Sequence, residues 1–291
     1  MKPQPFRYAR PETEAELAGL LAEHGDEARI LAGGQSLMPM LAMRLAGPAV
    51  IADINRLPGL DRITFEGGTL RIGSLVRHHM IAASPLIARH APMLAQAADH
   101  VAHPAIRNRG TLCGSLALAD PAAEFPACAV ALGATLVLRS RAGERRVAAA
   151  EFFRGTYETA LLPEEYLAAV LVPVIQPEER HVFLEIARRQ GDFAIAGLAA
   201  RATMRDGRLD DGTLVLFAAT DRPMACPQAS ALLEATASDR IDPAALANLL
   251  CENADFHGSH QASAGLKRHL AGVLAKRLLD RLRETARKAR P

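Results

Sequence analysis

Long apolar runs and aromatic side chains are scarce in this sequence of 291 residues, which has no tryptophan and 4 % aromatic residues. Because no run approaches the roughly 18 apolar residues of a membrane-spanning helix, we expect no transmembrane segment. Residues 1–10 also lack the apolar core of a secretory signal, so we expect a cytoplasmic protein. The hydrophobic fraction of 49 % is nevertheless sufficient for a sizeable core.

An excess of charge of one sign is missing as well. The chain has 34 Lys and Arg against 32 Asp and Glu, a formal net charge of +2, and the two signs are interspersed. A nucleic-acid-binding protein usually concentrates basic residues on one face. The balance therefore argues against a nucleic-acid partner.

Cysteine is rare, and its spacing excludes the common metal sites. Iron–sulfur clusters and structural zinc need clustered soft ligands, and no CxxC pair occurs, so we expect no metal in this chain. Disulfides are equally unexpected in a reducing compartment. The sequence has neither GxSxG nor HExxH, so we expect no catalytic residue of its own. The four cysteines are Cys113, Cys128, Cys226 and Cys251.

The hydrophobic pattern predicts an α+β protein, with a strand-rich first half and a sheet followed by helices in the second. Proline and polar residues at 173–179 mark a candidate domain boundary. Three strand-like runs follow, the last two joined at Asp206-Gly207, so we expect a three-stranded antiparallel sheet. A final amphipathic helix is expected at 264–288, with its basic residues in solvent. Other expected strands are 28–32, 49–54, 69–72, 135–139, 166–172, 182–187, 198–204 and 213–219, and other expected helices are 78–101, broken at Pro85 and Pro92, and 124–132.

A first glycine-rich segment lies between a predicted strand and a short helix, and reads Leu31-Ala32-Gly33-Gly34-Gln35-Ser36-Leu37-Met38. Glycine permits positive φ and close backbone approach. Successive backbone N–H groups with a serine hydroxyl form a nest for an anion such as a diphosphate. The spacing is neither GxGxxG nor GxxxxGK[ST], and on these residues alone an ordinary tight turn is the other interpretation.

A second segment runs from Ile106 to Glu124 and is rich in small residues and hydroxyls. Such a stretch suits close packing against an extended ligand. Asp120 and Glu124 stand in an otherwise apolar run, so each needs a hydrogen-bond donor or solvent, and sugar or ribityl hydroxyls are suitable donors. A helix N-cap is the alternative for Asp120, which precedes Pro121.

The two segments resemble the FAD-binding medium subunits of molybdenum hydroxylases, a family that includes aerobic carbon monoxide dehydrogenase and xanthine-dehydrogenase-like enzymes. The likeness covers essentially the whole chain, and its motifs occur in the family's order. It rests on Ala32-Gly33-Gly34-Gln35-Ser36-Leu37 with Met43-Arg44-Leu45 and Asp53-Ile54-Asn55, on His103-Pro104 with the second segment, and on Arg188-Arg189-Gln190-Gly191-Asp192-Phe193-Ala194.

The resemblance implies a vanillyl-alcohol-oxidase (PCMH) type of fold, in which two α+β subdomains hold FAD between them. The FAD-binding domain would span residues 1–176, with subdomains at about 1–57 and 58–176. A C-terminal domain of the carbon monoxide dehydrogenase flavoprotein type, with the three-stranded sheet and helices, would span residues 177–291.

The resemblance also implies a set of FAD contacts. The diphosphate would be wrapped by Leu31, Ala32, Gly33, Gly34, Gln35, Ser36, Leu37 and Met38, touched through the backbone by Val101 and Ala102, and held from the other side by Thr111, Gly114 and Ser115. Asp120 would lie nearby, Glu124 would bond toward the ribityl or adenosine portion, and Leu167 and Phe193 would lie against the flavin ring.

One position departs from the family pattern, because Cys113 stands where the family usually has the first glycine of Thr-x-Gly-Gly. If that position requires positive φ, the cysteine costs about 1 kcal/mol or more. If it requires close approach, the thiol crowds the diphosphate. Weakened FAD binding is therefore a hypothesis.

The function implied by the resemblance is electron transfer. A small partner subunit with [2Fe–2S] clusters would pass electrons to FAD in this chain, and a large molybdopterin subunit would hydroxylate the substrate, with the assembly a dimer of heterotrimers. An external acceptor would receive the electrons. The alternatives are a stand-alone FAD-dependent oxidase of a small organic substrate and a non-catalytic assembly subunit.

Overall fold

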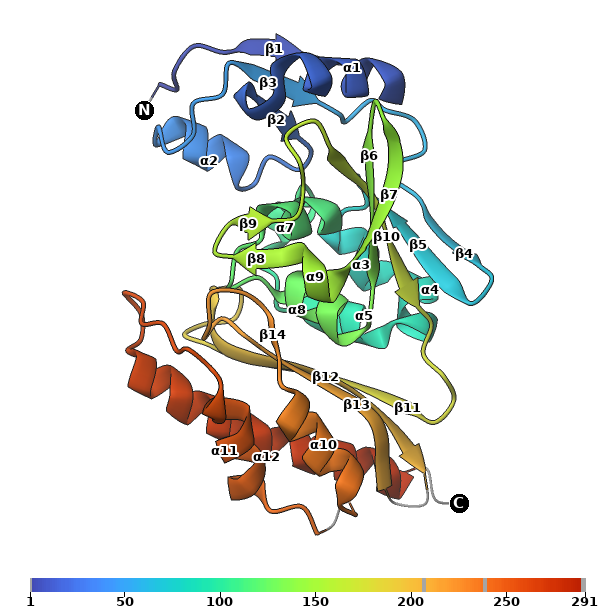
Figure 1. Cartoon of the computed structure of the whole chain (residues 1–291), viewed down its shortest axis with the longest axis vertical. Helices are drawn as coiled ribbons and strands as arrows, with labels where there is room; N and C mark the ends of the chain where they lie inside the picture. Colours follow the sequence, from blue (N-terminus) through green and yellow to red (C-terminus); the bar gives the residue numbers. More distant parts are fainter. Residues whose placement is uncertain (1, 206–207, 238–239, 289–291) are drawn as a thin grey trace.

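The computed structural model describes residues 2–205, 208–237 and 240–288, which form three parts stacked along the long axis (Figure 1). The predicted turn at Asp206-Gly207 lies outside these residues. The first of the three parts contains a parallel sheet in the order β1-β3-β2. The strands are β1 (Arg7–Ala9), β2 (Ala28–Leu31) and β3 (Val50–Asp53), and the helices are α1 (Glu14–His24), the 3₁₀ turn η1 (Gly25–Glu27) and α2 (Leu37–Ala42).

Helix α1 shows how neighbouring residues define an element of the first part. The Thr13 side chain accepts a hydrogen bond from the Glu16 N–H and caps the helix, and Gly25 ends it at φ +45°. Leu17 and Leu21 are buried and turn one helix face to the sheet. Strand β2 ends at Leu31, where the first glycine-rich segment begins.

The second part is an antiparallel sheet in the order β4-β5-β10-β6-β7, with helices packed beside it. Pro85 and Pro92 each begin a new helix, which confirms the predicted breaks. The strands are β4 (Ile63–Glu66), β5 (Thr69–Gly73), β6 (Thr135–Ser140), β7 (Gly143–Ala148), β10 (Tyr166–Pro173) and the separate pair β8 (Phe153–Gly155) and β9 (Glu158–Thr159). The helices are α3 (His78–Ala83), α4 (Pro85–His90), α5 (Pro92–Ala98), α6 (Pro104–Arg107), α7 (Leu112–Leu118), α8 (Glu124–Ala131) and α9 (Ala149–Phe152).

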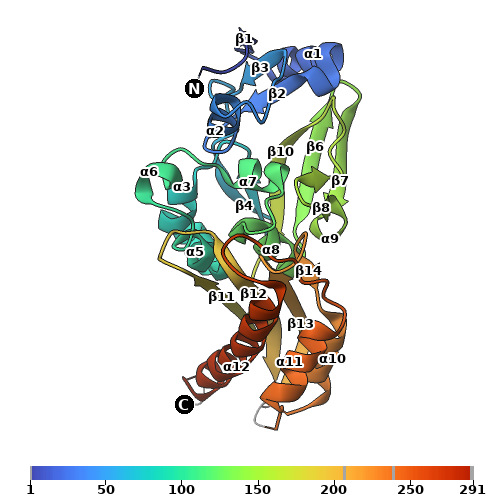
Figure 2. The ribbon, with the colours of Figure 1, turned by 90° about the vertical axis from the view of Figure 1, so that its left-hand side faces the viewer.

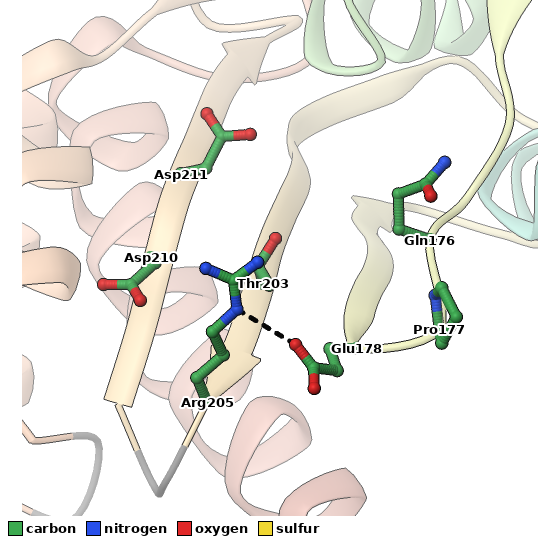
Figure 3. Close-up of a pocket in the computed structure, with 7 residues that line it drawn as sticks. All are labelled: Gln176, Pro177, Glu178, Thr203, Arg205, Asp210 and Asp211. Carbon is green, nitrogen blue, oxygen red and sulfur yellow. Dashed lines mark hydrogen bonds and ion pairs between the residues drawn. The ribbon is translucent and has the colours of Figure 1, made fainter.

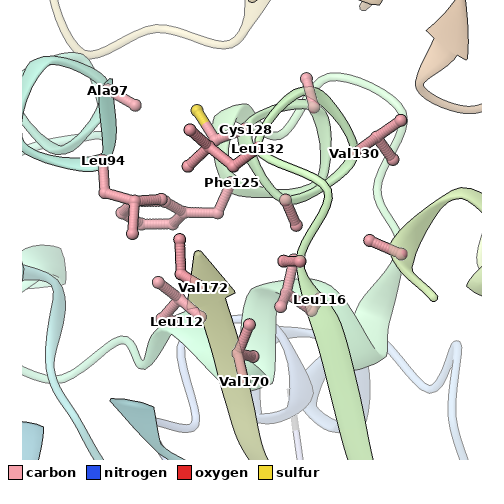
Figure 4. Packing of buried hydrophobic residues seen from close by; sticks show 14 of the residues in the cluster. Leu94, Ala97, Leu112, Leu116, Phe125, Cys128, Val130, Leu132, Val170 and Val172 are labelled. Carbon is pink, nitrogen blue, oxygen red and sulfur yellow. The ribbon is translucent and has the colours of Figure 1, made fainter. Parts of the chain in front are cut away.

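Helix α8 is the centre of the main core, and all eight of its residues are buried. Phe125 projects from it among Leu94, Leu112 and Val172, which come from α5, α7 and β10 (Figure 4). A helix that is apolar all round has to be buried, and α8 contacts both the helices of the second part and the sheet of the third.

The third part is an antiparallel sheet in the order β11-β12-β13-β14, so it has four strands where the sequence predicted three. The missed strand has two residues, too few to show the alternation by which strands are recognised. One face packs on the three C-terminal helices and the other on α5 and α8. The elements are β11 (Glu179–Ala187), β12 (Ala194–Arg205), β13 (Arg208–Phe217), β14 (Met224–Ala225), α10 (Pro227–Ala235), α11 (Pro243–Glu252) and α12 (Ala264–Lys288).

Candidate functional site

The first glycine-rich segment is a tight connection between β2 and α2. Gly34 has φ +73°, a conformation that a side chain disfavours. The Gln35 side-chain amide donates a 3.0 Å hydrogen bond to the Gly33 carbonyl and fixes the bend. Leu31, Ala32 and Leu37 are half-buried, whereas Ser36 and Met38 are exposed, so the bend presents its polar edge outward.

The two glycine-rich segments touch each other at Gly33. A Cβ atom there would lie 2.5 Å from the carbonyl oxygen of Arg109 and 2.7 Å from Cα of Gly110. No side chain fits in that space, so glycine is required for the close approach of two backbones. The structure thus brings together segments that are more than 70 residues apart in the sequence.

A chain of hydrogen bonds holds this contact in place. The Asn55 side-chain amide donates to the Ala32 carbonyl at 2.9 Å and to Asp53 Oδ1 at 2.6 Å. The Arg77 guanidinium donates to Asn55 Oδ1 and to the Arg109 carbonyl. Arg77 therefore links the two glycine-rich segments, because its guanidinium group bonds to both Asn55 and Arg109.

Thr111 is the N-cap residue of α7, and its hydroxyl accepts a 3.1 Å hydrogen bond from the Gly114 N–H. A Cβ on Gly114 would lie 2.7 Å from that hydroxyl oxygen, so the cap needs glycine at this position. Gly114 is exposed and Ser115 half-buried. Helix α7, which carries both residues, lies near α2 on the side of the molecule that faces the viewer in Figure 2.

Asp120 does not cap α8, because the N-cap residue is Ala123; the N-cap alternative is therefore wrong. One carboxylate oxygen of Asp120 accepts from the Ala122 N–H at 2.9 Å, and the other accepts from the Tyr157 hydroxyl at 3.3 Å. These bonds fix a turn that precedes the helix and keep Asp120 at the surface, half-buried.

Backbone strain is concentrated around the second segment. Four of the six described non-glycine residues with positive φ surround it, namely Ala102, Ala119, Tyr157 and Ala218. The Tyr157 N–H donates to the Ala119 carbonyl and the Ala218 N–H to the Pro121 carbonyl. Such conformations persist only where surrounding contacts hold them, and they cluster at functional sites.

Val101 and Ala102 are placed beside the third motif. The Arg107 side chain donates to both of their carbonyl groups, at 3.1 and 2.9 Å. Gly191, at φ +83°, approaches so closely that a Cβ would lie 2.9 Å from the Ala102 carbonyl oxygen. Phe193 follows, 63 % exposed, an unusual position for a large aromatic side chain. We call the part of the molecule formed by residues 31–38, 101–102, 111–115 and 191–193 the glycine-rich face; Ser36, Gly114 and Phe193 are among its exposed members, whereas Leu112 and Cys113 are buried.

Two expected contact residues lie beneath this face. Leu167 is 5 % exposed on β10 and belongs to the main core. Glu124 is 7 % exposed at the start of α8, where burial raises its pKa to about 8 and neighbouring Glu185 adds to the effect. The structure therefore keeps both side chains largely out of solvent.

Cys113 is not strained, so the alternative in which this position requires a positive φ is wrong for this chain. It lies in the first turn of α7 and is not among the described residues with positive φ. Its side chain points into the core, with the sulfur 4.0 Å from the Ile72 carbonyl, and burial raises the pKa of the thiol far above its usual range. The side chain therefore occupies core space.

His78 contacts the second glycine-rich segment at Gly110. Its backbone N–H donates to the Gly110 carbonyl at 3.0 Å, and its ring packs against Phe125 at 5.1 Å. Burial lowers the pKa of the ring to about 4, so it is neutral at physiological pH. Gly110 leaves room for the ring, since a Cβ there would lie 2.9 Å from it.

A surface pocket elsewhere has the wrong charge for a diphosphate. It lies between the linker at 176–178 and the β12–β13 hairpin (Figure 3). Glu178, Asp210 and Asp211 line it, and the single arginine of the lining, Arg205, is bound to Glu178 at 3.0 Å. Its acidic lining sets it apart from the glycine-rich face.

The described residues contain no cluster of three or more His, Cys, Asp or Glu side chains arranged to hold a metal ion. Among them, no helix is both long and apolar enough to cross a membrane.

Sequence reasoning missed the residues that join the segments. Arg77 and Tyr157 stand in no recognisable motif, and only their positions in the fold reveal their contacts. Asn55 and Gly191 belonged to quoted motifs without an assigned role. A long-range hydrogen bond leaves no periodic signal in a sequence.

The glycine-rich face suits a dinucleotide with a diphosphate. It offers the backbone N–H groups of the Gly33-Gly34 turn, the hydroxyls of Ser36 and Ser115, and an exposed aromatic ring. Arg109 is exposed beside it and supplies positive charge. Such nests of N–H groups bind anionic phosphate groups.

Comparison with known proteins places the chain in a family. Residues 4–175 match the FAD-binding domain in molybdopterin dehydrogenase, and residues 181–282 match the C-terminal domain of the CO dehydrogenase flavoprotein. The alpha subunit of the 6-hydroxypseudooxynicotine dehydrogenase complex of Paenarthrobacter nicotinovorans is 36 % identical over 98 % of both chains.

Solved structures agree over nearly the whole length. Quinoline 2-oxidoreductase from Pseudomonas putida 86 superposes with a TM-score of 0.91 at 37 % identity, covering 97 % of this chain and 98 % of that one. Carbon monoxide dehydrogenase from Hydrogenophaga pseudoflava, in a form lacking the Mo-pyranopterin moiety of the molybdenum cofactor, gives a TM-score of 0.92 at 33 % identity, covering 95 % and 96 %. The chain therefore belongs to the FAD-binding medium subunits of the molybdenum hydroxylase family.

Proposed function

We propose that the glycine-rich face is the FAD site of this chain. The observation that carries the proposal is the contact of Gly33 with Arg109 and Gly110, which places the two glycine-rich segments side by side. The first segment would wrap the diphosphate, Thr111, Gly114 and Ser115 would hold it from the other side, and Phe193 would lie against the flavin ring. Asp120 and Glu124 would serve the ribityl or adenosine portion.

The chain is an oxidoreductase subunit whose family works through FAD. Bound FAD supplies the redox chemistry, because a flavin accepts electrons singly and delivers them in pairs. The chain's own residues bind and orient it. Arg77 and Asn55 hold the two segments together and His78 contacts the second one, and the exposed aromatic ring of Phe193 would limit the approach of water to the flavin from one side.

The remaining assignments concern organisation. The chain would have an FAD-binding domain at 1–176 and a C-terminal domain at 177–291, and the family matches at 4–175 and 181–282 support this division. The FAD-binding domain would consist of subdomains at about 1–57 and 58–176. The partners would be a small subunit with [2Fe–2S] clusters and a large subunit with molybdopterin, assembled as a dimer of heterotrimers; the multi-subunit complexes of the relatives support this proposal. The cytoplasmic location stays a prediction from the sequence.

The test is the visible absorption spectrum of the purified chain before and after incubation with FAD and gel filtration. Retained flavin absorption that acid releases supports a noncovalent FAD subunit. Flavin that acid does not release, with oxidation of a small alcohol by the chain alone, supports the stand-alone oxidase. A chain that stays colourless, also when purified with its partners, supports the assembly subunit and overturns the proposed site.

A further inference from the structure

The third motif rests on the backbone of residues 101–103. Gly191 lies in the loop of residues 188–193 that joins β11 to β12, and its φ is +83°. A Cβ at Gly191 would lie 2.9 Å from the Ala102 carbonyl oxygen and 3.1 Å from Cε1 of His103. His103 is the N-cap residue of α6, which lies beside this loop in Figure 2. The position of the loop, and of Phe193 within it, therefore depends on the direction of the Ala102 carbonyl group.

Ala102 is held in a backbone conformation that alanine disfavours. Its φ is +40°, in the left-handed region where Cβ comes too close to the following carbonyl oxygen. A residue persists in this conformation only where the surrounding contacts hold it there. The contacts that hold Ala102 therefore also decide the direction of its carbonyl group.

Arg107, the last residue of α6, supplies such contacts. Its Nη1 donates hydrogen bonds to the Val101 carbonyl at 3.1 Å and to the Ala102 carbonyl at 2.9 Å. Hydrogen bonds from a charged donor are stronger than those between neutral groups. The Arg107 backbone N–H also donates to the His103 carbonyl at 3.0 Å. One residue thus fixes three consecutive carbonyl groups.

A second anchor lies directly before these carbonyl groups. His100 Nδ1 lies 3.5 Å from Glu185 Oε1, and the His100 ring packs against Phe183 with the ring centroids 5.3 Å apart. Glu185 and Phe183 both belong to β11, the strand that leads into the loop of Gly191. The contacts therefore close on themselves, because β11 holds His100, Arg107 holds the next residues, and Ala102 meets the loop that follows β11.

We propose that Arg107 is a positioning residue for the flavin end of the glycine-rich face. Its side chain holds the Val101 and Ala102 carbonyl groups in the orientation that seats Gly191, and it thereby sets the place of Phe193. This role rests on the proposed function, in which the backbone of residues 101–102 and the ring of Phe193 contact FAD. Arg107 acts through these neighbours, and it needs no contact of its own with the cofactor.

The first test is amide hydrogen exchange of the full chain without FAD, read by mass spectrometry. Arg107→Met removes both side-chain hydrogen bonds, so the exchange of residues 188–193 should become about tenfold faster or more, because local opening is easier. Exchange in α1 and α12 should not change, which separates this effect from a general loss of stability. Arg89→Met, at an exposed position of α4, is the control and should leave the loop unchanged. Unchanged exchange of the loop in Arg107→Met overturns the proposal.

The role of Arg107 in cofactor binding is tested by fluorescence titration with FAD. We expect the Kd for FAD to rise about tenfold or more in Arg107→Met, the loss typical of hydrogen bonds from a charged donor. Arg107→Lys keeps a charged donor, so its Kd should lie between those of the parent chain and Arg107→Met. Arg89→Met should bind FAD as the parent chain does. A Kd that does not change in Arg107→Met, or that lysine does not restore in part, overturns this role.

A double-mutant cycle shows whether Arg107 acts through Ala102. Gly191→Ala places a Cβ against the Ala102 carbonyl while Arg107 stays, so it should weaken FAD binding and speed the exchange of the loop by itself. Because both changes disturb the same contact, the Kd of the double variant should rise by less than the product of the two single rises. A rise equal to that product would show that Arg107 adds only general stability, and it overturns the proposal. Gly191→Ala also reports on the contact if Arg107→Met does not fold.

The exchange and binding experiments can fail separately. If the parent chain binds no FAD, alone or with its partners, the proposed function is contradicted, and with it the role of Arg107 toward the cofactor. The exchange measurement needs no FAD, so it still decides whether Arg107 holds the loop of Gly191. Normal FAD binding by the parent chain, with no change in Arg107→Met, leaves the proposed function intact and overturns only the role of Arg107.

Discussion

The ammonium group of Lys267 donates a 2.7 Å hydrogen bond to the carbonyl oxygen of Ala218. Lys267 lies in the first turn of α12 and is 7 % exposed, although the sequence predicted that the basic residues of this helix lie in solvent; for Lys267 that prediction is wrong. Ala218 in turn donates its N–H to the Pro121 carbonyl. The C-terminal helix is thereby tied to the second glycine-rich segment.

Replacement of Lys267 by methionine tests this tie. Methionine retains much of the apolar stem but leaves the Ala218 carbonyl without its donor, so we expect the free energy of unfolding to fall by about 1–3 kcal/mol. Urea denaturation followed by circular dichroism measures the loss. Lys276→Met, at an exposed position of the same helix, is the control and should change stability by less than about 0.5 kcal/mol. Equal effects would show that the tie contributes nothing.

Gly33→Ala tests the contact between the glycine-rich segments. The added Cβ would meet the Arg109 carbonyl, so the two backbones must separate, at a cost of about 1–3 kcal/mol. We expect FAD affinity to fall about tenfold or more, since each 1.4 kcal/mol is a factor of ten. Fluorescence titration with FAD measures the change.

Gly19→Ala is the matched control for that variant. Gly19 lies in α1, and a Cβ there would meet no atom within 4 Å. In a helix interior alanine is favoured over glycine by about 0.5–1 kcal/mol, so stability should rise slightly and FAD affinity should not change. Unaltered affinity in Gly33→Ala would contradict the assignment of the first segment.

Local signals in the sequence predicted the elements well where they were strong. Leu17 and Gly25 gave α1 an apolar face and a stop, and the structure ends the helix at His24, directly before Gly25. The strand before Leu31 and the helix breaks at Pro85 and Pro92 were likewise predictable, because each depends on neighbouring residues only.

What the sequence could not predict depends on residues far apart. Arg77 reaches Asn55 and the Arg109 carbonyl across 22 and 32 positions, and no pattern announces such bonds. Strand β14 has two residues and is defined by its partner β13 rather than by its own composition. The φ angle of Cys113 could not be predicted either. A glycine in a family pattern can be needed for a positive φ or for close approach of another group, and the sequence does not say which.

Cys113 is expected to matter for stability and not for FAD affinity. Its sulfur fills core space beside Ile72, so Cys113→Ala should cost about 0.5–1.5 kcal/mol. Cys113→Gly should cost about 0.5–1 kcal/mol more, because glycine is unfavourable within a helix. Both variants should bind FAD as the parent chain does. A gain in affinity in Cys113→Gly would show that the thiol obstructs the site.

Asp53 makes the stability of the protein depend on pH in the acid range. Burial by itself would raise the pKa of Asp53, but hydrogen bonds from Tyr8 and from the backbone and side chain of Asn55 outweigh it and hold the pKa below its ordinary value. Because the folded-state pKa is depressed, the stabilisation is present above the unfolded pKa of about 3.8 and is lost as the pH falls through the lower folded value.

Asp53→Asn should therefore destabilise the protein near neutral pH, and the difference from the parent chain should shrink as the pH falls below about 4. The variant should also bind FAD more weakly, because Asn55, which Asp53 orients, holds the Ala32 carbonyl. Urea midpoints measured from pH 3 to 7 test the first expectation, and FAD titration at pH 7 tests the second. A stability difference that stays constant down to pH 3 would mean that the charge of Asp53 does not stabilise the fold. Its role would then be limited to the shape of the hydrogen-bond network, which asparagine can partly reproduce.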